Sequence, residues 1–82
     1  MPDNVDLGEC VGLGAWTSCD MYCAAILEVC VESGCDGSTV VYYDDVNVCT
    51  AMTNGSGSAQ SCSDGFDMSG QNSFARCCCG QL

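Results

Sequence analysis

Ten cysteines in a chain of 82 residues constrain the fold of this protein more than any other feature of its sequence. An even number of cysteines at this density is typical of secreted proteins that disulfides crosslink, because cytosolic thiols stay reduced. We therefore predict that all ten cysteines are paired and that the protein is secreted and extracellular. The ten positions are Cys10, Cys19, Cys23, Cys30, Cys35, Cys49, Cys62, Cys77, Cys78 and Cys79.

The length of the chain allows a single domain, which we expect to span residues 1–82. Apolar residues make up 48% of the sequence, but this fraction includes the cysteines. A chain of this size buries only about 60–65% of the surface that it exposes when unfolded. Since the core is small, five disulfides, each contributing about 2–4 kcal/mol, would supply much of the stability.

Eleven acidic residues and a single arginine give the chain a formal net charge of −10. Nucleic acids and anionic lipids repel such a surface, so we expect no binding to nucleic acid. The first residues carry no basic and apolar leader, and a secreted protein would therefore have this sequence in its processed form. The longest apolar run, residues 23–27, is too short for membrane insertion.

The clearest periodic segment covers residues 17–33. Thr17 or Ser18 can cap a helix, Asp20 falls in its first turn, and Gly34 can end it. Apolar residues and cysteines recur on one face at helical spacing, which predicts an amphipathic helix or a kinked pair of short helices. The residues of this face are Cys19, Tyr22, Cys23, Ile26, Val29 and Cys30. A last helix is predicted from residue 69 or 73 to residue 79, with Arg76 in its final turn and Gly80 as its C-cap.

The segment at residues 39–53 is compatible with two structures. Residues 39–43 favour a strand, and residues 46–48 could return as the second arm of a hairpin. The same segment could be a helix that begins at Asp44 and stops at Asn54–Gly55. Before this segment, residues 1–15 read as a mostly irregular arm pinned at Cys10, and after it residues 54–61 read as a flexible loop.

Helix geometry limits how the cysteines can pair. Cys23 and Cys30 would lie about 10.5 Å apart along a helix axis. A disulfide needs Cα atoms about 4.4–6.8 Å apart, so these two cysteines must reach other elements. A bridge between neighbours in the triplet Cys77–Cys79 would be strained, and we expect each of the three to bond elsewhere.

The sequence contains few residues that could carry chemistry. It has no histidine and no C-x-x-C motif, which removes Ser–His and Cys–His catalysis and makes a zinc site improbable. The carboxylates at residues 44–45 and 64–67 lack the spacing of a calcium loop and are interpreted as solvated turn residues. We expect no catalysis, no metal and no cofactor.

Several side chains remain as candidates for recognition. Trp16 is either an exposed binding residue or part of the core, and the pair Tyr42–Tyr43 raises the same alternatives. Asp20 and Glu28 carry charge near the first predicted helix. Asn54 begins an N-glycosylation sequon in a predicted surface loop, although such sequons often occur by chance.

The stretch Cys23-Ala-Ala-Ile-Leu-Glu-Val-Cys30-Val-Glu-Ser-Gly-Cys35 resembles the ciliate mating pheromones of the Euplotes type. Ala15-Trp16-Thr17-Ser18-Cys19 is similar to a stretch in some members from cold water, and the acidic, cysteine-rich composition is similar as well. The C-terminal triplet has no counterpart in that pattern. The motif match therefore covers roughly 20 of the 82 residues, between residues 15 and 35.

This resemblance implies a small, disulfide-rich, mainly α protein that folds as a three-helix bundle, with the irregular arm and long loops outside it. It also implies a signal that binds a cell-surface receptor protein and tends towards self-association, and we place Trp16, Asp20 and Glu28 on the receptor-binding surface. The alternative fold is α+β with a short β-hairpin at residues 39–50. The alternative functions are a secreted inhibitor or toxin-like protein and a structural subunit of an extracellular assembly.

Overall fold

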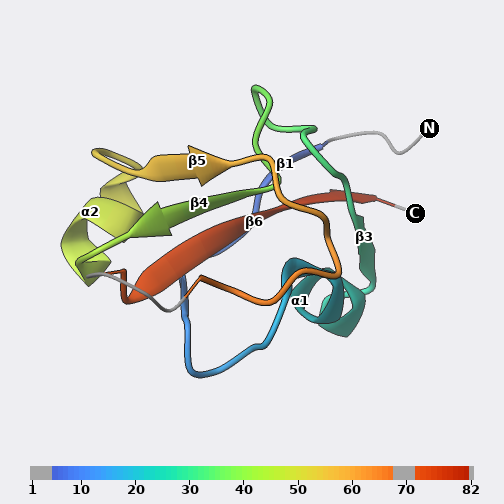
Figure 1. Cartoon of the computed structure of the whole chain (residues 1–82), viewed down its shortest axis with the longest axis horizontal. Helices are drawn as coiled ribbons and strands as arrows, with labels where there is room; N and C mark the ends of the chain where they lie inside the picture. Colours follow the sequence, from blue (N-terminus) through green and yellow to red (C-terminus); the bar gives the residue numbers. More distant parts are fainter. Residues whose placement is uncertain (1–4, 68–71, 82) are drawn as a thin grey trace.

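The computed structural model of the chain describes residues 5–67 and 72–81. Within these ranges the protein is an antiparallel β-sheet of six strands flanked by two short helices (Figure 1). The prediction of a three-helix bundle is therefore wrong. The elements are β1 (Asp6–Leu7), β2 (Val11–Gly12), α1 (Cys19–Ala25), β3 (Glu28–Cys30), β4 (Val40–Tyr43), α2 (Val46–Ala51), β5 (Ser56–Ser58) and β6 (Phe74–Gln81).

Strand β6 is the centre of the sheet. Its residue Cys79 pairs with β1 at Asp6 and with β3 at Cys30, so these two strands lie on opposite sides of it. Nearer its start, Ala75 pairs with β2 and with β4 in the same way. Strand β5 pairs with the outer side of β4 and completes the sheet. One eight-residue strand thus receives backbone hydrogen bonds from four other strands.

The prediction of a helix at the C-terminal end is wrong because this segment is β6. Residues 69–71 lie outside the described residues. In a strand, successive side chains point to opposite faces, so Cys77 and Cys79 share one face and Cys78 lies on the other. Gly80 is a buried strand residue paired with Val29 and not a helix cap.

The first predicted helix is shorter than residues 17–33. Its start is correct, since the Ser18 hydroxyl accepts a hydrogen bond from the Met21 N–H at 3.4 Å. The helix stops at Ala25, and Leu27 then adopts a left-handed backbone with φ 62°. The chain turns there and continues as β3 along β6. The helical spacing of Cys23 and Cys30 predicted one helix through both residues. Cys30 lies in β3 instead, and the backbone of β3 forms its hydrogen bonds with β6.

The segment at residues 39–53 contains a strand and a helix in succession. Strand β4 covers the expected β residues, and α2 follows, with Asp45 rather than Asp44 at its N-cap and Met52 left-handed at its C-cap. Residues 46–48 are therefore helical, and the hairpin at residues 39–50 does not form. Strand β4 pairs with β6 on one side and with β5 on the other, and β5 lies within the predicted flexible loop at residues 54–61.

The hydrophobic core lies against one face of the sheet. The side chains of Val40, Tyr42 and Ala75 point from β4 and β6 towards α1, and Leu13, Tyr22 and Phe66 cover them. The N-terminal arm, residues 5–15, is not irregular, because β1 and β2 pair with β6. Its attachment at Cys10 is a disulfide to Cys49 in α2.

Candidate functional site

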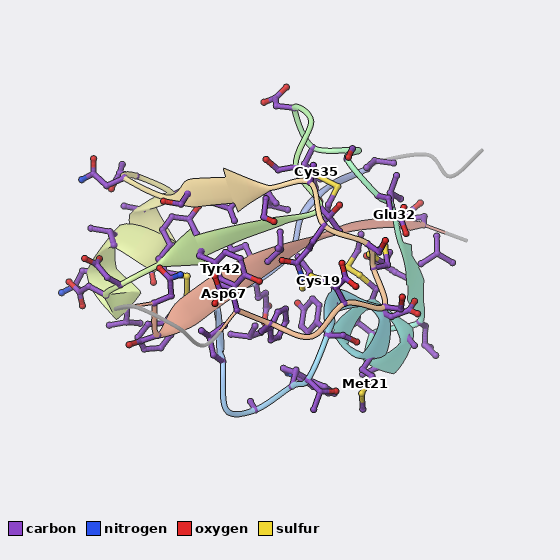
Figure 2. All side chains as sticks on the ribbon, viewed as in Figure 1. Cys19, Met21, Glu32, Cys35, Tyr42 and Asp67 are labelled. Atoms are coloured by element: carbon purple, nitrogen blue, oxygen red, sulfur yellow. A yellow bond between two sulfur atoms is a disulfide. The ribbon has the colours of Figure 1, made fainter. Side chains whose placement is uncertain are left out.

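Five disulfides join the ten cysteines, all of which are among the described residues. Each member of the C-terminal triplet bonds to a cysteine outside the triplet, as we expected from the strain of a bridge between neighbours. Two bridges tie α1 to the core face of β6, and a third holds residue 35 to its opposite face (Figure 2). The pairs are Cys10–Cys49, Cys19–Cys77, Cys23–Cys79, Cys30–Cys62 and Cys35–Cys78.

Three large apolar side chains lie exposed at the α1 end of the molecule. Met21, Ile26 and Leu27 are 52%, 42% and 80% exposed, and we call these three residues the apolar tip. Figure 2 shows Met21 directed away from the body of the protein. All three lie in α1 or in the two residues that follow it. Apolar patches on a surface, unlike single exposed apolar residues, are a common mark of an interaction surface.

The backbone explains why the apolar tip is exposed. The Ile26 N–H donates to the Cys23 carbonyl at 3.2 Å, and the Leu27 N–H donates to the Ala24 carbonyl at 3.1 Å. These bonds close a turn after the last residue of α1, and the left-handed Leu27 then points outward. A left-handed conformation is unfavourable for a side chain such as leucine, and such residues gather at functional sites.

Two disulfides hold this turn in place. Cys23, whose carbonyl accepts the first of these hydrogen bonds, is bonded to Cys79 in β6. On the other side of the turn, Cys30 at the end of β3 is bonded to Cys62. The apolar tip is therefore presented by a short segment with a covalent crosslink before it and after it.

Acidic residues flank the apolar tip. Asp20 is exposed in the first turn of α1, and Glu28 begins β3 directly after Leu27. Glu32 follows β3, and its carboxylate accepts a hydrogen bond from the Cys62 N–H at 3.2 Å. In the sequence, two of the three predicted recognition residues thus adjoin the apolar tip, with Asp20 before Met21 and Glu28 after Leu27.

Trp16, the third predicted recognition residue, is neither fully exposed nor fully buried. It is partly buried against the core, and its ring meets that of Tyr22 edge to face at 5.8 Å between centroids. Trp16 therefore packs against α1 through Tyr22. Tyr42 and Tyr43 are only 5% and 3% exposed, so these two belong to the interior and not to a recognition surface.

The carboxylates that we interpreted as turn residues do act in turns. The Asp64 carboxylate accepts a hydrogen bond from the Ser61 N–H at 3.0 Å and so closes its own loop. Nearby, Gln60 accepts from the Tyr42 hydroxyl at 2.8 Å and donates to the carbonyls of Asp64 and Gly65. In residues 5–67 and 72–81, no group of three or more acidic or cysteine side chains is arranged to hold a metal ion.

The apolar tip is the feature that sequence reasoning missed. The helical pattern placed Ile26 on the buried face of a longer helix, and Leu27 carried no signal of its own. Only the early end of α1 and the left-handed turn bring both side chains to the surface. Asn54, the first residue of the sequon, is exposed and lies in the turn between α2 and β5, and its glycosylation stays a prediction.

Comparisons of the chain with protein families, with curated proteins and with solved structures find no significant match. In the described part of the chain, neither helix has the length and apolar character needed to cross a membrane.

Proposed function

We propose that the protein is a secreted signalling ligand of the pheromone kind, which binds a cell-surface receptor protein through the α1 end. The observation that carries this proposal is the apolar tip, where Leu27 is 80% exposed in a strained turn that two disulfides enclose. The sequence resemblance to the Euplotes-type pheromones covers this same region, from residue 15 to residue 35.

Rigidity supports a role in binding. An interface loses affinity when binding must order its side chains and loops, and a surface that is already fixed avoids part of this loss. Disulfides to Cys79 and Cys62 fix the backbone on both sides of Leu27 before any partner arrives. A dense set of disulfides is also compatible with an extracellular protein.

The charges around the apolar tip indicate what kind of receptor surface would fit it. Asp20 and Glu28 adjoin the apolar tip in the sequence, and the whole chain carries a formal charge of −10. Interfaces commonly combine an apolar centre with a polar rim, and opposite charges speed the encounter. The fitting receptor surface is an apolar pocket with basic residues at its rim.

The test replaces Leu27 by asparagine, which tolerates the left-handed backbone but removes the apolar contact. We expect Leu27→Asn to weaken binding of labelled protein to cells of its source species about 30-fold, as the loss of an interface hot spot does. Folding should be unaffected because the side chain is exposed, and a thermal melt checks this.

Met52→Asn is the matched control. Met52 is also a left-handed, exposed apolar residue, at 51% exposure, but it follows α2 at the far end of the molecule from α1 (Figure 1). Binding by Met52→Asn should equal that of the unmodified protein. Equal binding by Leu27→Asn would remove the apolar tip from the receptor site, and failure of the unmodified protein to bind or stimulate such cells would overturn the signalling function.

A further inference from the structure

The turn between α2 and β5 contains the sequon Asn54-Gly55-Ser56. It is the only Asn-x-Ser or Asn-x-Thr in the sequence. All three residues are exposed, and the turn lies at the α2 end of the molecule, away from α1 (Figure 1). A transferase can add a glycan only to a sequon that it can reach, so this position satisfies the first requirement of a glycosylation site.

The backbone of the turn explains two of the three sequon residues without any glycan. The φ of Asn54 is 56°, and asparagine is one of the few residues with a side chain that readily adopt this left-handed conformation. An added Cβ at Gly55 would lie 2.5 Å from Val41 Cγ1, so this position requires glycine. Asn54 and Gly55 therefore do not distinguish a turn from a modification site.

Ser56 is the residue that the turn does not explain. It lies in β5 opposite Tyr42 and is exposed. Within residues 5–67 and 72–81 its hydroxyl forms no hydrogen bond, whereas the Ser58 hydroxyl in the same strand bonds to Gln60 Oε1 at 3.2 Å. The fold thus uses one serine of this strand and leaves the hydroxyl of the other open. A hydroxyl two residues after an exposed asparagine completes the glycosylation signal.

The same end of the molecule carries exposed apolar side chains. Val46, the first residue of α2, is 45% exposed, and Met52, the C-cap of α2, is 51% exposed. Met52 lies two residues before Asn54 in the sequence. A glycan is bulky and increases solubility, so one attached beside these residues would shield apolar surface that otherwise faces water.

We propose that Asn54 carries an N-linked glycan. In the transfer, the side-chain Nδ2 forms a bond to C1 of the first sugar and gives up one proton. The bond from C1 to a lipid-linked pyrophosphate breaks, and the lipid pyrophosphate leaves with its electron pair. The lipid-linked oligosaccharide and its transferase belong to the secretory route, so the proposal rests on the secretion that the proposed function requires. The glycan lies at the α2 end and leaves the apolar tip uncovered (Figure 1).

The test uses the protein purified from a culture of its source species, cells and medium together. After proteolysis, we expect the peptide that contains residue 54 to be heavier than its sequence and to lose this excess on treatment with a peptide-N-glycosidase. This enzyme hydrolyses the glycosylated amide to a carboxyl group, so the treated peptide should contain aspartate at position 54. A native peptide with the mass of its sequence, or aspartate formed at another position, would overturn the proposal.

This measurement does not depend on receptor binding. A protein that carries the glycan and binds no cells would contradict the signalling function and support the glycosylation site. A protein that binds cells and carries no glycan would do the reverse.

Variants at Ser56 separate the sequon from the turn. Ser56→Ala removes the hydroxyl and leaves Asn54 and Gly55 in place, and it should abolish the glycan when the chain is secreted from cultured eukaryotic cells. Ser56→Thr keeps a hydroxyl and should keep the glycan. Ser58→Ala is the matched control, because it removes a hydroxyl from the same strand outside the sequon, and it should keep the glycan as well. A glycan on Ser56→Ala, or equal loss from Ser58→Ala, would contradict the assignment.

Enzymatic removal of the glycan from the native protein locates it on the surface. We expect the backbone amides of residues 46–57 to shift in the NMR spectrum and those of residues 19–28 to stay unchanged, since α1 lies away from this turn (Figure 1). Shifts centred on α1 would show that the glycan covers the receptor end and would overturn its placement.

Discussion

At the scale of single residues, left-handed backbone conformations shape the surface of this protein. Leu27, two residues after α1, and Met52, the C-cap of α2, both adopt this conformation, and both have large exposed apolar side chains. Glycine usually takes such positions because it has no Cβ. Because leucine and methionine occupy these positions, large apolar side chains face solvent after both helices.

Gly55 is a residue at which close packing excludes any side chain. An added Cβ would lie 2.5 Å from Val41 Cγ1 and 2.6 Å from Tyr43 Cε1, and Tyr43 is buried. We expect Gly55→Ala to lower the free energy of unfolding by about 1–3 kcal/mol, as overpacking does. Denaturant unfolding with the disulfides intact measures this change.

Gly14→Ala is the control for that measurement. No atom lies within 4 Å of the position of an added Cβ at Gly14, and its φ is not positive. The substitution should leave stability unchanged or raise it by about 0.4–1 kcal/mol, because alanine restricts the unfolded chain. Equal destabilisation by both variants would contradict the close approach at Gly55.

At the scale of elements, the short helix α2 depends on contacts with the rest of the molecule. A helix of six residues is unstable by itself. The Cys10–Cys49 disulfide ties it to the N-terminal arm, and Arg76 donates to the carbonyls of Cys49 and Thr50 near its C-terminal end, at 2.7 and 3.3 Å. Arg76 also donates to Gly8, so one guanidinium joins α2 and the arm to β6.

Arg76→Lys keeps the positive charge but removes the planar group that reaches three carbonyls at once. We expect the variant to lose about 1–2 kcal/mol of unfolding free energy, as hydrogen bonds to a charged group contribute. Amide hydrogen exchange in α2 should become faster, while exchange in α1, which Arg76 does not contact, stays the same. Unchanged exchange in α2 would show that the disulfide alone holds this helix.

At the scale of the whole molecule, the disulfides connect segments that are far apart in the sequence. Separations of 32 to 58 residues mean that each bridge strongly restricts the unfolded chain. Three of the five bridges end on β6, so this strand joins α1 and the turn at residue 35 covalently.

Reduction of the five disulfides should unfold the protein at room temperature. Their combined contribution, at about 2–4 kcal/mol each, is comparable to or larger than the 5–15 kcal/mol by which a domain is typically stable. Loss of amide dispersion in the NMR spectrum of the fully reduced protein measures this. A fully reduced protein that keeps its native dispersion would show that the core in Figure 2 suffices without crosslinks.

Some features of this protein follow from its sequence alone. The start of α1 at Ser18 was predictable because a serine cap is a local interaction. The separate partners of Cys77, Cys78 and Cys79 were predictable because disulfide geometry limits which cysteines can meet. Strand β4 was among the alternatives, since its residues favour β structure wherever they lie.

The central strand and the candidate site were decided by tertiary structure. The residues of β6 have no strong preference between helix and strand. This segment is a strand because β1, β2, β3 and β4, all distant in the sequence, form hydrogen bonds with it. Because Glu28–Cys30 pair with β6, they form a strand and not part of the predicted helix, and the left-handed turn before them leaves Leu27 exposed to solvent. Local pattern cannot show such pairing, because its hydrogen bonds form only when segments more than 30 residues apart meet.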